Sequence, residues 1–245
     1  SAKINMICSK SRPMSQNRTS EQGCIVVLDL HRLIDTKKRN SMSVSNPHLK
    51  LENATFETSA ATLAQCPVDG KLEIAFCGRS NAGKSSAINY LTSNKKLART
   101  SKTPGRTQLI NFFSISDEFR MVDLPGYGYA KVPSAVKKDW HRNIDQYLQK
   151  RAALCGLVLM MDIRHPLKEF DKTMIEWSLN SQVPLHILLT KCDKLKRGAQ
   201  SKALFAVNKQ LPDNVSVQLF SSTHAIGKDQ FLIQLRIWLA DLVNI

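Results

Sequence analysis

The sequence predicts an α/β protein with three layers. A mostly parallel sheet of about six strands, one of them an antiparallel edge strand, is expected between two layers of helices. From residue 72 onward, short apolar runs of strand length alternate with longer segments of helical periodicity. A glycine-rich loop joins the first apolar run to the first helix, and further polar loops follow later strands. Open α/β sheets bind their ligands at such loops.

Composition limits the class of protein. The chain has 245 residues, which suits one large domain or two small ones, and its net charge of +15 favours an anionic partner such as nucleic acid or a membrane surface. Its six cysteines lack C-x-x-C spacing, which argues against zinc and fits a reducing compartment. No apolar run approaches the roughly 20 residues that span a bilayer. We therefore expect a cytoplasmic monomer without stable membrane insertion.

The chain divides by composition near residue 45. Residues 1–45 are rich in Ser, Asn, Lys and Arg, with a single apolar island at 24–28, and we interpret them as a basic, disordered tail. Residues 46–245 carry the strand and helix pattern and form the expected folded domain. An edge strand is expected near residues 54–56.

The elements of the folded domain follow from their apolar patterns. Two of the strands are joined by a tight turn at residues 116–117, so they are antiparallel. The last helix begins after Gly227 and places Phe231, Leu235, Trp238, Leu239 and Leu242 on one core-facing stripe. The expected strands are 72–77, 108–115, 118–122, 157–161, 185–189 and 215–220, and the other expected helices are 86–91, 134–151, 170–179 and 199–211.

The glycine-rich loop, residues 78–85, has the pattern G-x-x-x-x-G-K-S of a phosphate-binding P-loop. Its glycines let backbone N–H groups surround phosphate oxygens, and the following helix directs its positive end to the same place. In this pattern Lys84 reaches the terminal phosphates and Ser85 offers its hydroxyl to Mg²⁺. The strand before the loop and the helix after it make a chance match improbable.

Two further segments fit the phosphate end of a nucleotide site. Asp123 ends a strand, where it can hold Mg²⁺ directly or through water, and the N–H of Gly126 is expected to contact a γ-phosphate. Thr103 and Thr107 are both candidates for a third Mg²⁺ ligand in a Ser/Thr/Gly-rich loop. We choose Thr107 because it lies just before a strand.

The segment 190–193 matches the guanine-reading pattern [N/T]-K-x-D after another strand. Guanine presents two donors, N1–H and the 2-amino group, which an ionised Asp193 can accept. Adenine has an acceptor at N1 and would leave the carboxylate unpaired, so the pattern selects against ATP. Lys191 is expected to lie along the base and to contact the P-loop. Phe220, Ser221 and Ser222 end the last strand and are expected to offer backbone contacts to the guanine oxygen.

The combined motifs resemble the EngB (YihA/YsxC) family of bacterial GTPases. The resemblance rests on 79–82, 103–108, 123–129 and 162–168, and it covers roughly residues 46–245. It implies a Ras-like P-loop fold, a Mg²⁺-dependent GTP/GDP cycle, and a role in large ribosomal subunit assembly with links to cell division and septation. Cys192 replaces the small residue usual at its position, and we expect no loss from it.

Catalysis is expected to be slow. Tyr127 stands where Ras-like enzymes have a water-orienting Gln, and the sequence shows no arginine finger, which can contribute about 10³–10⁵-fold. Asn81 occupies the position that holds K⁺ in related GTPases lacking that Gln, so K⁺ is a possible second cofactor. The alternatives are a P-loop kinase or ATPase for a small molecule, and an RNA-binding module with a vestigial nucleotide site.

Two segments, 97–107 and 124–133, are expected to switch conformation with the nucleotide. A basic surface for ribosomal RNA is expected from Lys131, Lys137, Lys138, Arg142, Lys150 and Arg151, together with Lys191, Lys194, Lys196 and Arg197.

The predicted catalytic residues are Lys84, Thr107 and Gly126, and the predicted metal ligands are Ser85, Thr107 and Asp123. The predicted nucleotide-binding residues are Gly78, Arg79, Ser80, Asn81, Ala82, Gly83, Lys84, Ser85, Gly105, Arg106, Thr107, Gln108, Leu109, Asp123, Leu124, Pro125, Gly126, Thr190, Lys191, Cys192, Asp193, Phe220, Ser221 and Ser222.

Overall fold

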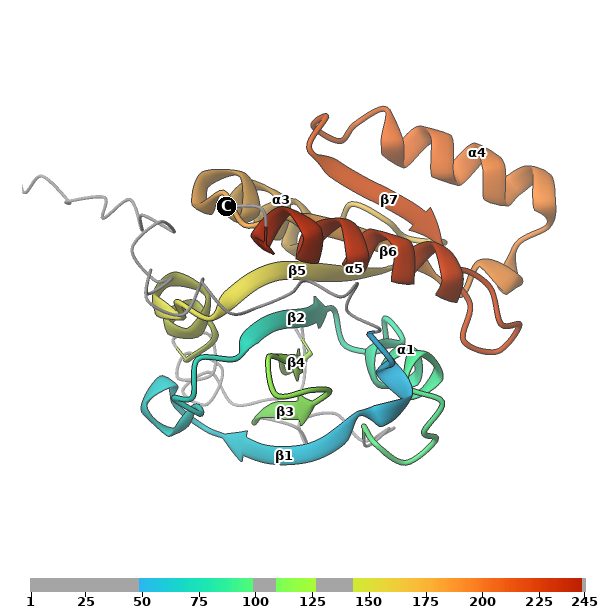
Figure 1. Ribbon diagram of the computed structural model, residues 1–245. Helices are drawn as coiled ribbons and strands as arrows, with labels where there is room; N and C mark the ends of the chain where they lie inside the picture. Colours follow the sequence, from blue (N-terminus) through green and yellow to red (C-terminus); the bar gives the residue numbers. More distant parts are fainter. Residues whose placement is uncertain (1–48, 99–108, 127–142, 244–245) are drawn as a thin grey trace, which may run out of the picture.

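A seven-stranded sheet forms the centre of the protein (Figure 1). The computed structural model describes residues 49–98, 109–126 and 143–243. The strand order is β1-β3-β4-β2-β5-β6-β7, and β3 runs antiparallel to both of its neighbours while the other pairs are parallel. The strands are β1 (Thr55–Ala60), β2 (Leu72–Gly78), β3 (Ile110–Ser114), β4 (Phe119–Asp123), β5 (Leu154–Asp162), β6 (Leu185–Thr190) and β7 (Val215–Leu219).

The sheet differs from the predicted one at a single edge. The expected edge strand near 54–56 is a six-residue strand, β1, which makes the seventh strand of the sheet. Because β1 pairs outside β3, the antiparallel strand is second from the edge and not at the edge. The full length of β1 was not predicted because its sequence is polar. An exposed edge strand needs little apolar surface, so its apolar pattern is weak.

Helices cover both faces of the sheet and complete the three predicted layers. Alternate residues of β2 point to opposite faces, so Ile74 and Phe76 pack with α1 and α5, whereas Ala75 and Cys77 pack on the side of α3. The strand order and the two helix layers match the three-layer α/β/α architecture that the sequence predicts. The helices are α1 (Lys84–Leu91), α3 (Glu169–Ser181), α4 (Arg197–Asn208) and α5 (Lys228–Val243), with short 3₁₀ turns at η3 (Leu51–Asn53), η4 (Leu63–Gln65) and η5 (Cys192–Lys194).

The predicted helix 134–151 lies partly outside the described residues, and its part 143–150 is helical. The apolar stripe predicted for the last helix is buried in α5 at Phe231, Leu235, Trp238 and Leu239. None of the helices within the described ranges is both long enough and apolar enough to cross a bilayer.

A buried ionic cluster anchors the helical segment 143–150 to the start of β2. Glu73 is fully buried and accepts hydrogen bonds from Tyr147 Oη at 2.8 Å and from Arg151 Nε and Nη2 at 2.9 and 2.5 Å. Burial raises the pKa of Tyr147 well above its ordinary value, and the Glu73 carboxylate adds to this, so the phenol stays a donor. Arg151 was predicted to contact ribosomal RNA, but this contact with Glu73 commits its guanidinium to the interior.

Replacing Glu73 by Gln should destabilise the fold strongly. The isosteric amide leaves the Arg151 guanidinium without its carboxylate, and breaking a buried pair in this way costs about 3–5 kcal/mol. Urea denaturation of Glu73→Gln measures the loss. Glu52→Gln is the control, because Glu52 pairs with Lys228 at 2.6 Å at the surface and should cost at most about 1 kcal/mol. Equal losses in the two variants would contradict this role for the cluster.

Candidate functional site

Most of the predicted site residues that the structure describes lie at or after the carboxyl ends of parallel strands, which point the same way in the sheet (Figure 1). The register brings the loops together: Gly78 at the end of β2 lies beside Met160 of β5, and Asp162 at the end of β5 lies beside Thr190 of β6. The segments after β2, β4, β5, β6 and β7 therefore surround one region, as the sequence predicts for an α/β sheet.

Two glycines are required by the geometry of the P-loop. Gly78 lies so close to β5 that a Cβ there would be 2.7 Å from the backbone oxygen of Met160. Gly83 has a φ of 91°, a left-handed conformation that favours glycine, and it caps the N-terminus of α1. Because Gly83 is the cap, α1 begins at Lys84, two residues earlier than predicted.

Lys84 and Asp123 form an ion pair between the P-loop and the end of β4. Both residues are buried, so their charges interact with little screening by solvent. Ser85 follows directly, which places a hydroxyl and a carboxylate on the two segments that meet here. Oxygen donors of these kinds are what Mg²⁺ prefers, so the residues present fit the ion that the sequence predicts.

The carbonyl groups of the P-loop are held from β6. Thr190 Oγ1 donates to the backbone oxygen of Ala82 at 2.6 Å and also lies 3.0 Å from that of Met161. Lys191 Nζ donates to the backbone oxygen of Asn81 at 2.5 Å. The predicted contact of Lys191 with the P-loop is therefore present, and Thr190 adds a second one that the sequence did not reveal.

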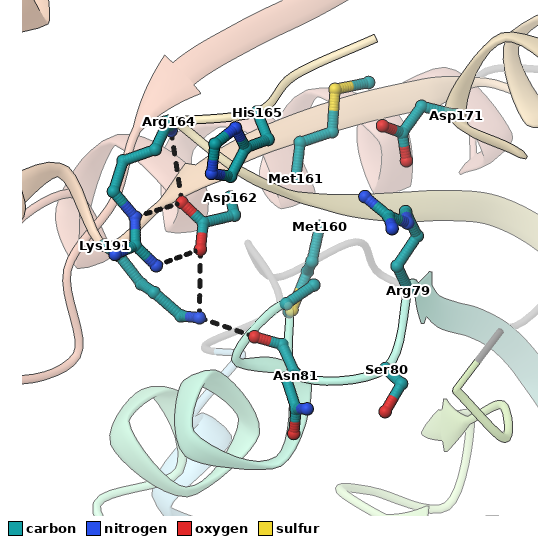
Figure 2. Close-up of a pocket in the computed structure, with 11 residues that line it drawn as sticks. Arg79, Ser80, Asn81, Met160, Met161, Asp162, Arg164, His165, Asp171 and Lys191 are labelled. Atoms are coloured by element: carbon teal, nitrogen blue, oxygen red, sulfur yellow. Dashed lines mark hydrogen bonds and ion pairs between the residues drawn. The ribbon is translucent and has the colours of Figure 1, made fainter. Parts of the chain in front are cut away.

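Asp162 and Arg164 support Lys191 from the end of β5 (Figure 2). Asp162 accepts hydrogen bonds from Arg164 Nε at 2.9 Å, from Arg164 Nη2 at 2.6 Å and from Lys191 Nζ at 3.0 Å. The hydrogen bond from Arg164 holds the pKa of Asp162 well below its usual range, and Lys191 lowers it further. Asp162 therefore stays ionised and fixes the direction of the Lys191 side chain.

Asp193 presents a buried carboxylate oxygen without a hydrogen-bond donor. Its side chain is 4% exposed, and Oδ1 accepts a hydrogen bond from Ser221 Oγ at 2.6 Å. Lys194 Nζ lies 3.2 Å from Oδ2, but no donor within the described ranges makes a hydrogen bond to that oxygen. Burial raises the pKa of Asp193, but the contacts with Ser221 and Lys194 outweigh it and hold the pKa below its ordinary value. The group is an ionised acceptor whose Oδ2 has an ion-pair contact with Lys194 but no hydrogen bond within the described residues.

The P-loop, the end of β5 and the start of α3 enclose a pocket of about 210 Å³. In Figure 2 the Arg79 side chain extends toward Asp171 of α3. Asp171 is buried, its Oδ2 accepts from the Lys168 N–H at 2.9 Å, and its Oδ1 lacks a hydrogen-bond partner within the described residues. Burial raises the pKa of Asp171. The pocket adjoins the outer side of the P-loop, and sequence reasoning did not find it.

Several predicted residues are placed by the structure, and others lie outside it. Leu124, Pro125, Gly126, Cys192 and Phe220 are buried beside the site. Leu109 is 41% exposed just before β3. Outside the described residues lie Thr103, Gly105, Arg106, Thr107, Gln108, Tyr127, Lys131, Lys137, Lys138 and Arg142, together with most of both predicted switch segments.

The sequence missed the side chains that hold the predicted residues in place. The Ser221 hydroxyl binds Asp193, which the sequence did not reveal, and the expected backbone contact of Ser221 with guanine stays a prediction. Asp162 and Arg164 belong to a segment that supported the family resemblance without an assigned role. Their position directly after a buried strand was the available signal, because every other ligand-facing loop follows a strand in the same way.

Comparison with known proteins agrees with this geometry. Residues 73–191, a little under half of the chain, match the protein-family model described as a 50S ribosome-binding GTPase. The matched segment begins in β2 and ends just after β6, so it contains the P-loop, Asp123 and Lys191. The chain therefore carries a GTP-binding GTPase domain.

Solved structures share the fold at low sequence identity. A crystal structure of a probable GTP-binding protein engB is 22% identical with a TM-score of 0.54, and the match covers 70% of this chain and 98% of that one. Era in complex with MgGDPNP and a segment of 16S ribosomal RNA is 17% identical with a TM-score of 0.55, covering 69% and 57%. Aquifex aeolicus Era bound to GDP and aluminium fluoride is 16% identical with a TM-score of 0.53, covering 68% and 56%.

Adding a methyl group at Gly78 should disturb the P-loop. The Cβ of Gly78→Ala would lie 2.7 Å from a backbone oxygen, so the loop or β5 must shift, at a cost of about 1–3 kcal/mol in unfolding free energy. Urea denaturation gives the value. Gly198→Ala is the matched control, because a Cβ there meets no atom within 4 Å and lies in a helix, where it should be neutral or stabilising. Indistinguishable stabilities would show that the approach of β2 to β5 is not tight.

Proposed function

We propose that this protein is a GTP-binding and GTP-hydrolysing switch of the EngB type that acts in assembly of the large ribosomal subunit. The observation that carries the nucleotide part is Asp193 Oδ2, a buried oxygen that has an ion-pair contact with Lys194 but no hydrogen-bond donor among the described residues. A buried, ionised oxygen without a hydrogen-bond donor is costly to maintain, and a ligand that donates to it removes that cost.

Guanine supplies the missing donors. Its N1–H and 2-amino groups lie side by side and match the two oxygens of one carboxylate. Adenine presents a lone pair at N1, which would face the same carboxylate without a proton between them. The site supports a guanine nucleotide over an adenine nucleotide, which argues against the small-molecule kinase or ATPase.

The phosphate end is expected at Lys84 and Asp123. A nucleoside triphosphate would offer Lys84 a second anionic partner, and Mg²⁺ would offer Asp123 a second cationic one. Binding would therefore replace the buried ion pair by contacts of each residue with a charged ligand. Ser85 and Asp123 would hold the ion, with Thr107 as the proposed third ligand. Mg²⁺, when bound, neutralises charge that develops on the phosphates during transfer. The intact Lys84, Ser85 and Asp123 argue against a vestigial site.

We propose slow intrinsic hydrolysis, in which Lys84 and the Gly126 N–H stabilise the γ-phosphate. The proposal rests on Tyr127 at the position of the water-orienting Gln and on the absence of an arginine finger from the sequence. K⁺ beside Asn81 is proposed as an electrostatic substitute. Asn81 has a left-handed backbone with a φ of 64°, and its carbonyl accepts a hydrogen bond from Lys191.

The ribosomal part of the proposal rests on the net charge of the chain and on its similarity to ribosome-binding GTPases. The net charge of +15 favours ribosomal RNA as partner, and the matched family model is described as ribosome-binding. The Era structure with the same fold contains ribosomal RNA. From the composition we further propose a cytoplasmic monomer with a basic tail at 1–45 and switch segments at 97–107 and 124–133. From the family resemblance we propose a link to cell division and septation.

Exchanging the Asp193 carboxylate for an amide tests the guanine assignment. Asp193→Asn replaces one acceptor oxygen by a donor, so affinity for GTP should fall about 100-fold or more, because one hydrogen bond becomes a donor–donor contact and the other loses its charge assistance. Xanthosine triphosphate carries an oxygen at position 2 and should bind the variant better than GTP does. Titration of both nucleotides against the variant, with Asp213→Asn at an exposed position as control, gives the two affinities. Unchanged preference for GTP would refute the assignment.

A further inference from the structure

The outward face of α4 carries only positive charge. From Lys194 to Pro212, both included, the chain has five Lys/Arg residues and no Asp or Glu. By contrast, α3 and α5 mix acidic and basic residues along their lengths. Figure 1 places α4 beside β7, at the end of the sheet opposite β1. A helix with basic residues and no acidic ones, at one end of the molecule, favours an anionic partner there.

Helical spacing places three exposed side chains on the outermost line of α4. Lys202, Phe205 and Lys209 are exposed and separated by three and four residues, so they follow one another along the same face. Val207 is buried on the opposite side and belongs to the core. Neither lysine makes an ion pair with an acidic residue of the described chain, in contrast to Lys191 and Lys194.

Phe205 stands between these lysines with its ring open to solvent. It is 71% exposed, and no other aromatic ring among the described residues lies against it. The other exposed phenylalanine, Phe56, has an edge contact with Phe113. Phe205 is therefore a flat apolar surface flanked by two ammonium groups about 10 Å apart along the helix.

We infer that Lys202, Phe205 and Lys209 form an RNA-contact surface on α4 that stacks an unpaired base on the ring and pairs neighbouring phosphates with the two lysines. Aromatic rings accept any base face, and lysines track the backbone, which is how proteins hold single-stranded nucleic acid. This inference rests on the proposed function, because it names the part of the surface that meets ribosomal RNA.

The α4 surface is fixed relative to the base-binding loop. On the inner side of the helix, Gln200 Nε2 donates to the backbone oxygens of Cys192 and Leu195, both at 2.9 Å. These two carbonyls flank Asp193. An RNA segment bound to the α4 surface therefore lies at a defined position relative to the proposed guanine pocket. The helix α4 separates the two, because Gln200 faces the base-binding loop and Phe205 faces solvent.

Fluorescence anisotropy with a labelled dodecamer of uridine tests the inference on the full chain in the presence of GDP and Mg²⁺. Phe205→Ala should weaken binding by about fivefold to a hundredfold through loss of one base stack. The double variant Lys202→Gln/Lys209→Gln should make the plot of log affinity against log salt shallower by about 0.7 for each lysine. Lys95→Gln/Lys172→Gln removes the same charge from exposed positions elsewhere and should change neither quantity comparably.

Aromatic and aliphatic replacements of Phe205 distinguish RNA from a protein partner. Phe205→Trp should keep RNA binding because it keeps a ring, whereas Phe205→Leu should lose it although it stays apolar. Three results would overturn the inference. They are no binding of the RNA by the wild type, an unchanged RNA affinity of Phe205→Ala, and an equal loss of RNA affinity in the Lys95/Lys172 control. GDP affinity of each variant is measured in parallel and should equal that of the wild type. A wild-type chain that bound RNA through α4 but bound no guanine nucleotide would refute the proposed function and leave the α4 surface standing.

Discussion

The hydrogen bonds that join β6 to the P-loop are the constraint on which the candidate site depends. Thr190 and Lys191 hold the carbonyl oxygens of Ala82 and Asn81, so the loop cannot turn those oxygens toward the phosphate side. With the carbonyls held outside, the N–H groups of the loop remain available to an anion. The base motif and the phosphate motif are therefore one unit, although more than 100 residues separate them in the chain.

Charged side chains form ion pairs at both ends of the sheet. At the ligand end, Lys84 faces Asp123, and Asp162 binds Lys191 and Arg164. At the other end, Glu73 binds Arg151 and thereby anchors the helical segment 143–150. Both oxygens of Glu73 accept hydrogen bonds from Arg151, whereas Asp193 Oδ2 has no hydrogen-bond donor among the described residues. A buried carboxylate oxygen without such a donor, in the base motif that follows the end of β6, is a candidate ligand-binding group.

The sequence predicted the fold and the motif positions well, because both depend on local patterns. Alternating apolar runs specify strands and helices, and the spacing of Gly78, Gly83 and Lys84 specifies a P-loop. It did not predict the full length of β1, whose polar residues gain their place from pairing with β3. Nor did it predict that Ser221 binds Asp193 or that Arg151 binds Glu73. These contacts join residues distant in the chain, and no local pattern encodes them.

The most direct test of the central claim is a competition assay for the nucleotide base. A fluorescent GDP bound to the full chain in Mg²⁺ is displaced with unlabelled GTP, GDP and ATP in parallel. The account predicts that GTP and GDP compete while ATP is weaker by about 100-fold or more, because adenine leaves the Asp193 carboxylate unpaired. Displacement by ATP at the same concentrations as GTP would contradict it.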